Sequence, residues 1–243
     1  MSLAVPKTSM VLAAGLGTRL KPGTDARPKP LMEVLGKPLL DHTLDRLAEA
    51  GVETAVVNTH HLADQLERHL ATREKPRIRL SHEPTILDTG GGIAKALPVL
   101  GKGPFLSVNA KIVWLDGGTP ALQRLAERWD DATMDGLLLL HPTVAAPTHD
   151  GQGDFFLDPE GRIRRRRSWE VAPFVYTGIQ ILHPRLFDGA PDGAFSLNLL
   201  YDRAIEAGRL HGLRHDGQWF QVTAPKHLAL IEQALAELGF AAA

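Results

Sequence analysis

The stretch SMVLAAGLGTRLKPGTDARPKPL, residues 9–31, decides the fold of this chain. It begins as an apolar run typical of a buried β-strand and breaks directly into Gly15 and Gly17. In α/β proteins ligands usually sit at the carboxyl ends of such strands. Glycines allow a sharp turn there and let bare backbone N–H groups approach a phosphate closely. The stretch therefore predicts the first strand of an α/β fold, followed by an anion-binding loop.

The next hundred residues repeat this alternation of strand and helix. Strand-like runs lie at 54–59, 77–82, 105–109 and 135–142, and helical patterns at 39–51, 61–71, 91–101 and 119–129. Strands separated by helices of this length imply right-handed crossovers and a largely parallel sheet. We therefore expect an α/β, doubly wound sheet with helices on both faces.

The regular alternation of strands and helices ends after residue 142. Residues 153–167 read as a hairpin around the turn sequence DPEG, and 174–183 read as a further strand. A helix and then a strand fit 197–213, and a closing helix fits 225–238. With no linker and no repeat, we predict a single domain over 1–243, in which a small β insertion makes the sheet mixed.

Composition excludes several classes of partner. The chain is 44% apolar and 23% charged, has a formal net charge of -1 and contains no cysteine. Such a chain can bury a sizeable core, and its charge gives no electrostatic reason to bind nucleic acid or an acidic membrane. Without a recognisable signal peptide or long apolar run, we expect a cytoplasmic protein. The sequence does not determine the oligomeric state, for which we favour a monomer.

Two cations accompany the glycine loop. Arg19 can grip phosphate oxygens in two places through its planar guanidinium, and Lys29 is a point charge held between Pro28 and Pro30. As a dinucleotide fingerprint the loop is incomplete, because Leu20 stands where the third glycine belongs, and it also lacks the GK[ST] of a P-loop. On its glycines alone, an ordinary turn at a strand end remains an alternative.

The whole stretch resembles the sugar-1-phosphate nucleotidyltransferases, whose pattern is a strand, then L-A-A-G-x-G-T-R-L, then a P-K-P loop. Further matching motifs are Gly36–Leu39, Asp88–Gly92, Gly153–Phe155 and Thr177–Ile179. The D-T-G-G-G run and the short length look most like the N-acetylmuramate-1-phosphate uridylyltransferase branch, which serves peptidoglycan recycling. The resemblance implies a Rossmann-like fold and transfer of a nucleotidyl group from a nucleoside triphosphate to a sugar 1-phosphate, releasing pyrophosphate. It also implies a nucleotide-binding half over about 1–142 and a sugar-binding half over about 143–243.

The resemblance assigns roles to individual residues. The nucleotide contacts would be Ala13, Ala14, Gly15, Leu16, Gly17, Thr18, Asp88, Thr89, Gly90 and Asn109. The catalytic cations would be Arg19, Lys29 and Lys111, and the sugar contacts Gly153, Asp154, Thr177 and Gly178. Glycine amides in the 88–92 run would face the base or ribose. An alternative for that run is a helix N-cap formed by Asp88 or Thr89.

The positions that the resemblance assigns to Mg²⁺ are altered. Relatives end the fourth strand in N-x-D, where this chain has Asn109-Ala110-Lys111. A second acid or histidine, expected in W-x-D/H-V-G-T, is replaced by Gln221. Mg²⁺ prefers anionic oxygen ligands, and an ammonium about 4 Å away would repel it by several kcal/mol. Asp116 is a candidate substitute ligand, although its position before a helix favours a solvated residue.

Two outcomes follow for the altered site. Lys111 can occupy the place of the metal ion and neutralise phosphate, which gives a slow or metal-independent transferase. The alternative is a catalytically inactive paralogue that binds or senses nucleotide or sugar phosphate. A nicotinamide-dependent oxidoreductase fits poorly, because the second strand ends in Asn58 and not in an acidic residue.

Overall fold

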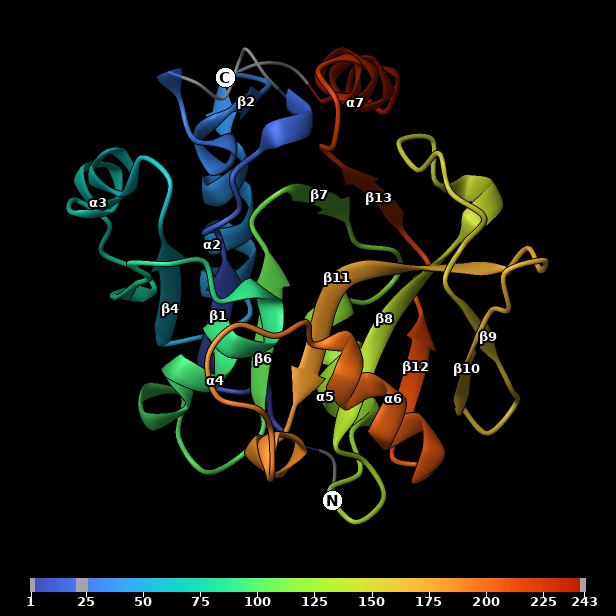
Figure 1. Cartoon of the computed structure of the whole chain (residues 1–243). Helices are drawn as coiled ribbons and strands as arrows, with labels where there is room; N and C mark the ends of the chain where they lie inside the picture. The colour runs from blue at the N-terminus through green and yellow to red at the C-terminus, as the bar shows by residue number, and fades with distance from the viewer. Residues whose placement is uncertain (1–2, 21–25, 241–243) are drawn as a thin grey trace.

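The computed structural model describes residues 3–20 and 26–240, and these form a nine-stranded central sheet (Figure 1). Its parallel half has the order β6-β1-β4-β5. These strands are β1 (Thr8–Leu12), β4 (Thr54–Thr59), β5 (Arg77–His82) and β6 (Phe105–Asn109). From β1 the chain runs outward to β4 and β5, and then returns to β6 on the opposite side of β1. The strand order therefore reverses at β1, which is where open α/β sheets usually bind ligands.

The second half of the sheet is mostly antiparallel. The long β11 (Phe174–Leu182) runs antiparallel to β6, and β8 (Gly136–Pro142) runs antiparallel to β11. β12 (Leu210–Arg214) is parallel to β8, and the predicted hairpin is β9 (Phe155–Leu157) with β10 (Ile163–Arg165). The sheet is thus mixed, as expected, and its antiparallel part begins at β11.

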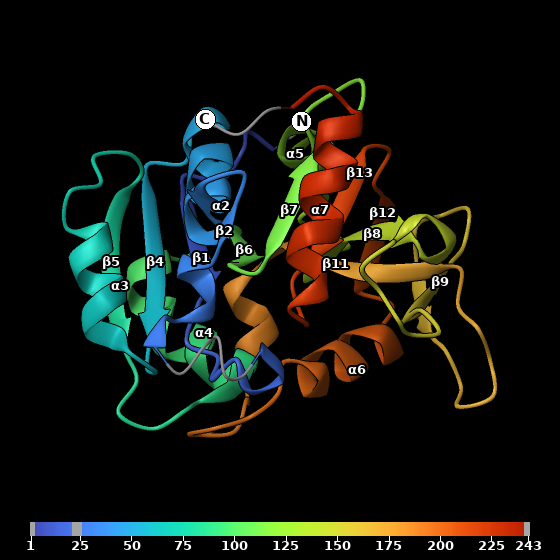
Figure 2. The same ribbon diagram turned by 90° about the horizontal axis from the view of Figure 1, so that it is seen from above.

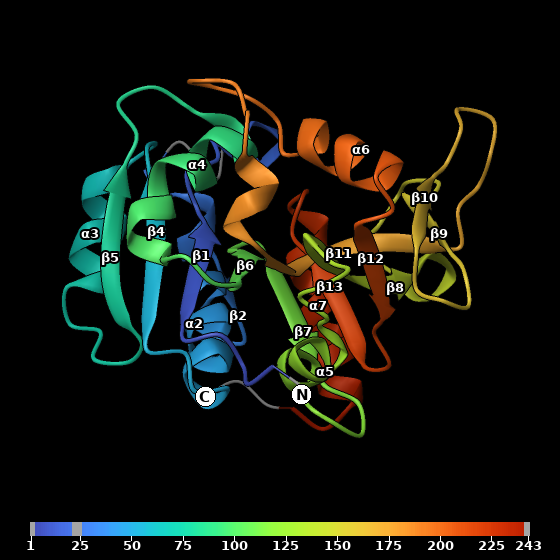
Figure 3. The ribbon, with the colours of Figure 1, turned by 90° about the horizontal axis from the view of Figure 1, so that it is seen from below.

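Helices cover both faces of the sheet (Figures 2 and 3). One face carries α2 (Leu39–Glu49), α3 (Ala63–Leu70) and α5 (Ala121–Arg128). The other carries α4 (Asp88–Leu100) and α6 (Asn198–Glu206). Neighbouring β1 residues Met10 and Val11 belong to different core clusters, because successive side chains of a strand point to opposite faces. The doubly wound fold predicted from the alternation is therefore confirmed.

A third apolar cluster lies outside these two layers. The closing helix α7 (Lys226–Glu237) packs there through Ile231 and Leu235. Its neighbours are two small antiparallel pairs: β7 (Ile112–Leu115) with β13 (Gln218–Gln221), and β2 (Glu33–Val34) with β3 (Lys37–Pro38). The sequence patterns predicted none of these short strands. The β7–β13 pair matters for function because it leads directly from Lys111 to Gln221.

The remaining elements are single turns of 3₁₀ helix: η1 (Thr18–Leu20), η2 (Lys29–Leu31), η3 (Thr143–Ala145) and η4 (Pro184–Phe187). The helix predicted at 91–101 begins earlier, at Asp88. Its N-cap is Leu87, so the interpretation of Asp88 or Thr89 as the N-cap was wrong. Within the described ranges, none of the helices has the length and apolarity needed to cross a bilayer.

Candidate functional site

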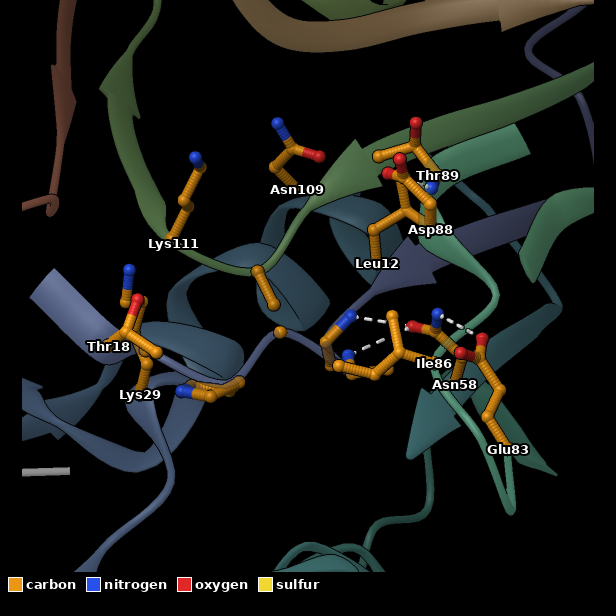
Figure 4. Close-up of a pocket in the computed structure, with 16 residues that line it drawn as sticks. Leu12, Thr18, Lys29, Asn58, Glu83, Ile86, Asp88, Thr89, Asn109 and Lys111 are labelled. Carbon is orange, nitrogen blue, oxygen red and sulfur yellow. Dashed lines mark hydrogen bonds between the residues drawn. The ribbon is translucent and has the colours of Figure 1, made fainter. Parts of the chain in front are cut away.

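A cavity of about 310 Å³ opens at the carboxyl ends of β1, β4 and β6 (Figure 4). Its position is where the strand order reverses. Ten of the residues that the resemblance assigned to nucleotide binding or catalysis line it: Ala13, Ala14, Gly15, Gly17, Thr18, Lys29, Asp88, Thr89, Asn109 and Lys111. The fold thus brings together segments that lie nearly a hundred positions apart in the sequence.

Three of the predicted nucleotide or catalytic residues are not seen in the lining. Leu16 is exposed but does not contribute to the cavity wall, and Gly90 is buried behind it. The side chain of Arg19 lies outside the described part of the structure, although its backbone belongs to η1. The roles predicted for these residues stay predictions.

The glycine loop is held from beneath by Asn58, the penultimate residue of β4. Its Oδ1 accepts hydrogen bonds from the backbone N–H groups of Ala13 at 2.6 Å and Ala14 at 3.3 Å. Gly17 adopts a left-handed φ of 65°, a conformation that favours glycine. A Cβ at Gly15 would meet open space, so this part of the loop leaves room for a ligand. Two of the expected amides are therefore engaged by the protein, and the open surface begins at Gly15.

Asn58 is itself fixed by Glu83, which is only 1% exposed. The Asn58 Nδ2 donates to Glu83 Oε1 at 2.7 Å (Figure 4). Glu83 Oε2 accepts from the backbone N–H of Leu87 at 3.0 Å. A Cβ at Gly92 would lie 2.8 Å from Glu83 Oε1, so helix α4 approaches this pair closely through a glycine. Sequence reasoning missed both residues and the neighbouring Ile86. Asn58 and Glu83 share one signal, a polar residue at or just after a strand end, and Ile86 carries no such signal.

The 88–92 run packs against the 193–195 segment. The amides of Gly90 and Gly91 donate to the carbonyl of Phe195 at 2.9 and 3.2 Å. A Cβ at Gly90 would lie 2.2 Å from the Phe195 ring. In this structure these two amides therefore bind protein, in contrast to the expectation that they face the base or ribose. Asp88 and Thr89 line the cavity, although the Thr89 hydroxyl also accepts the amide of Leu197 at 3.0 Å.

The two lysines lie on one side of the cavity, and Asp88 and Thr89 lie across from them, as Figure 4 shows. Lys29 opens η2 after Pro28, whose extended backbone (φ -65°, ψ 144°) directs the chain into the turn. Lys111 sits between β6 and β7, and its carbonyl accepts the amide of Val222 at 2.8 Å. Lys29 and Lys111 are thus carried by backbone that is already ordered by the fold.

The second altered metal position does not face the cavity. Gln221 pairs with Ile112 in the β7–β13 ladder, so its backbone lies beside that of Lys111. Its amide donates to Thr148 Oγ1 at 2.8 Å, and its side-chain Nε2 lies 3.3 Å from His149 Nδ1. Asp116 does not line the cavity either. Its carboxylate accepts a hydrogen bond from the Ala121 amide at the start of α5, at 2.9 Å.

The donor set does not fit Mg²⁺. The two positions assigned to the metal carry an ammonium and an amide. Over residues 3–20 and 26–240, no group of three acidic, histidine or cysteine side chains is arranged to hold a metal ion. Magnesium is usually held by carboxylates together with substrate phosphates and water. The cavity supplies cationic nitrogen where such a site needs anionic oxygen.

The four predicted sugar contacts lie outside the cavity lining. The Thr177 hydroxyl is buried and donates to the carbonyl of Leu139 at 2.8 Å, and Asp154 Oδ2 accepts the amide of Tyr176 at 2.8 Å. Gly153 and Gly178 have left-handed φ values of 73° and 83°. In this structure all four shape the backbone around β11, and their contacts with a sugar stay a prediction.

Solved structures with this arrangement define the class. A UDP-glucose pyrophosphorylase complexed with UDP-glucose matches with a TM-score of 0.78 and 16% identity, covering 96% of this chain and 99% of that chain. An inositol-1-phosphate CTP transferase from T. maritima matches with a TM-score of 0.79 and 16% identity, covering 99% of each. At such low identity the likeness shows the fold alone, which is that of Rossmann-like nucleotidyltransferases.

Sequence relatives place the chain more closely. The model of the family described as Nucleotidyl transferase matches residues 8–148. An N-acetylmuramate alpha-1-phosphate uridylyltransferase from Caulobacter vibrioides is 45% identical over 237 residues, covering 96% of this chain and 98% of the relative. One from Neisseria meningitidis serogroup B is 34% identical, covering 88% and 92%. The chain belongs to the nucleotidyl transferase family, and the expected enzyme class is confirmed.

Proposed function

We propose that this nucleotidyltransferase transfers the uridylyl group of UTP to N-acetylmuramate 1-phosphate and releases pyrophosphate. The observation that carries the proposal is the 45% identity to the Caulobacter uridylyltransferase over nearly the whole of both chains. The cavity at the strand switch point, lined by the glycine loop and two lysines, supports a polyphosphate ligand. Cytoplasmic localisation and a monomeric state belong to the same proposal.

The chemistry requires little covalent participation by the protein. A phosphate oxygen of the sugar 1-phosphate attacks the α-phosphorus of UTP, and a new P–O bond forms. The bond from the α-phosphorus to the oxygen bridging to the β-phosphorus breaks, and its electron pair leaves with pyrophosphate. Catalysis of such a transfer is mostly positioning and stabilisation of charge. In this proposal Arg19 neutralises the leaving pyrophosphate, and Lys29 the charge developing on the α-phosphoryl group.

The binding of the two substrates is divided between the halves of the chain. The loop from Gly15 to Thr18 would follow the triphosphate, and Asp88, Thr89 and Asn109 would contact the nucleoside. The sugar would bind from the β11 side, where Gly178 approaches Asn109 closely: a Cβ at Gly178 would lie 2.5 Å from Asn109 Nδ2. This proximity supports a sugar site that continues from the nucleotide site.

The family of sugar nucleotidyltransferases typically uses a divalent metal ion. Because the residues of this chain do not fit Mg²⁺, the mechanism above includes no step through a metal. Lys111 stands at the position where the resemblance expects the metal-binding aspartate, and it lines the cavity. Its ammonium is a suitable group to neutralise phosphate oxygens directly.

A pyrophosphate-release assay tests the proposal. The full chain is incubated with UTP, CTP, GTP or ATP and with N-acetylmuramate 1-phosphate, N-acetylglucosamine 1-phosphate or glucose 1-phosphate, each with and without Mg²⁺. We expect the fastest release with UTP and N-acetylmuramate 1-phosphate, and none when the sugar phosphate is omitted. A faster reaction with another base or another sugar phosphate would replace the proposed substrates.

A protein that binds UTP without transferring it is the second candidate, and Lys111 and Gln221 are the observations that favour it. The same assay separates the two candidates when it is combined with calorimetric binding of UTP and of N-acetylmuramate 1-phosphate. Pyrophosphate release above the background without protein supports the enzyme. Tight binding of both compounds with no release under any metal condition supports the binding protein.

A further inference from the structure

Lys111 is placed at the cavity wall by backbone bonds on both sides. The amide of Ala110 donates to the carbonyl of Leu12 at 3.1 Å, and the carbonyl of Lys111 accepts from Val222 at 2.8 Å. Ala110 is buried, and Ile112 begins the β7–β13 ladder at once. The backbone around Lys111 is therefore fixed between two strands, and its side chain leaves from a defined point.

The acidic groups of the lining lie away from the lysines. In the described part of the cavity these are Glu83 and Asp88. Glu83 is buried, and both of its oxygens accept hydrogen bonds, from Asn58 and from the amide of Leu87. Asp88 lies across the cavity from Lys29 and Lys111 (Figure 4). The wall where the metal ligands are expected is therefore shaped by two ammonium groups.

The neighbouring strand contributes no anion to this wall either. Gln221 is neutral, and its side chain is directed to His149. The next residue, Val222, is fully buried in the third apolar cluster. A divalent cation entering beside Lys111 would meet repulsion from the ammonium, and the described lining offers its only carboxylates, Glu83 and Asp88, away from that wall. The same ammonium would attract the oxygens of a triphosphate that carries no metal ion.

We infer that this site selects the metal-free nucleoside triphosphate over its Mg²⁺ complex, with Lys111 and Lys29 binding the phosphate oxygens directly. The inference rests on the proposed function and concerns which ionic form of the substrate the enzyme takes. Because Mg²⁺ also binds the triphosphate in solution, it competes with the protein for the nucleotide. Free Mg²⁺ then inhibits substrate binding. Lys111 at the end of β6 changes which ionic form of the nucleotide the site binds.

Isothermal titration calorimetry with UTP tests this on the full chain. The wild-type protein is titrated in EDTA and again in excess MgCl₂, and Kd is compared. We expect UTP to bind roughly tenfold more tightly in EDTA. Lys111→Asp should reverse that order, and Lys111→Met should weaken binding in EDTA without creating a need for Mg²⁺. Lys102→Asp is the matched control: it makes the same charge change at an exposed residue before β6, and it should behave as the wild type.

The outcomes separate this inference from the proposed function. If wild-type protein binds UTP more tightly in MgCl₂ than in EDTA, the inference is overturned and the uridylyltransferase proposal stands. If UTP does not bind in either buffer, the proposed nucleotide is wrong and the inference fails with it. The comparison does not depend on the folding of any variant, because the wild-type protein in the two buffers decides it. Melting curves from circular dichroism show whether the Lys111 variants are folded before their Kd values are used.

Discussion

At the scale of single residues, the Asn58–Glu83 pair supports the glycine loop. Its members are buried, and they join the ends of β4 and β5 to the backbone at Ala13 and to the start of α4. Buried polar groups contribute to the stability of the fold when all their hydrogen bonds are made, and they destabilise it when a partner is lost. The pair therefore couples the position of the glycine loop to the helix behind it.

The change Asn58→Ala should lower both stability and nucleotide binding. It leaves the Ala13 amide and Glu83 Oε1 without the partner that Asn58 supplies, a loss of about 1–3 kcal/mol in the free energy of unfolding. Urea denaturation measures that loss, and calorimetry with UTP measures the binding. Asn198→Ala, at an exposed asparagine of α6, serves as the control and should change neither. Full stability in Asn58→Ala would contradict the role given to this network.

Restoring the metal positions should change the chemistry. The double change Lys111→Asp, Gln221→His introduces the residue types that the resemblance expects at these two positions. We expect it to raise Mg²⁺-dependent uridylyl transfer by roughly tenfold or more, since one charge-stabilising group often changes a rate by at least that factor. Turnover at saturating Mg²⁺ is compared with that of the wild type. Equal or lower turnover in a folded double variant would count against this account of the site.

At the scale of elements, β11 joins the parallel and antiparallel halves of the sheet, because it pairs with β6 on one side and with β8 on the other. The pairing of β11 with β8 shifts its register between Tyr176 and Gln180. Within this bulge the Thr177 hydroxyl donates to the Leu139 carbonyl and accepts the Ile179 amide at 3.2 Å. The Thr177 carbonyl accepts a hydrogen bond from Trp219 Nε1. The bulge thus satisfies its own backbone and brings Gly178 against Asn109.

The change Thr177→Val tests whether this residue supports the bulge or binds the sugar. Valine keeps the shape but buries the Leu139 carbonyl and the Ile179 amide without the hydroxyl, which should lower the free energy of unfolding by about 1–3 kcal/mol. Thr177→Ser keeps the hydroxyl and should retain most of the stability. Chemical denaturation and the KM for the sugar phosphate are measured together. A raised KM at unchanged stability would favour direct sugar binding.

At the scale of the whole molecule, two histidines are buried close together. His141 of β8 and His215, just after β12, have ring centroids 5.7 Å apart, and burial lowers the pKa of each. The positive charges of His215 and Arg214 also lower the pKa of His141. For His215 the carboxylates of Asp116 and Asp216 act in the opposite direction, but burial outweighs them. Charging His141 would place a cation beside the ring of Trp219, whose centroid lies 6.0 Å away.

These histidines predict that the protein loses stability in acid. Because the folded pKa lies below the ordinary value of 6.5, the unfolded chain binds more protons between those two values. Stability contributed by the neutral rings is complete above about pH 6.5 and declines as the pH falls toward the folded pKa values. Urea denaturation at about pH 7.5 and about pH 5 measures the decline. His215→Gln should make it shallower, and an unchanged pH dependence would argue against this origin.

How far the fold could be predicted depends on the kind of element. The strands at 54–59 and 77–82 were predicted to the residue and the helix at 61–71 to within two residues, because short β-rich runs mark the strands and the helix repeats with the helical period. The short β7 was missed, since four apolar residues directly after Lys111 carry no turn signal to separate them from β6. The start of α4 was placed three residues too late, at position 91, because the residues at 88–90 add no apolar position to the helical pattern.

By itself the sequence determined the strand and helix alternation, the glycine loop with Lys29, and the presence of Lys111 and Gln221 where the resemblance expects metal ligands. These features follow from local sequence patterns and from residue identity, so they can be recognised without knowing which residues are in contact. Only the tertiary structure decided that Asn58 holds the loop and that Gln221 faces His149. Such contacts join residues 45 and 72 positions apart, and they depend on how strands pair and where each side chain is directed.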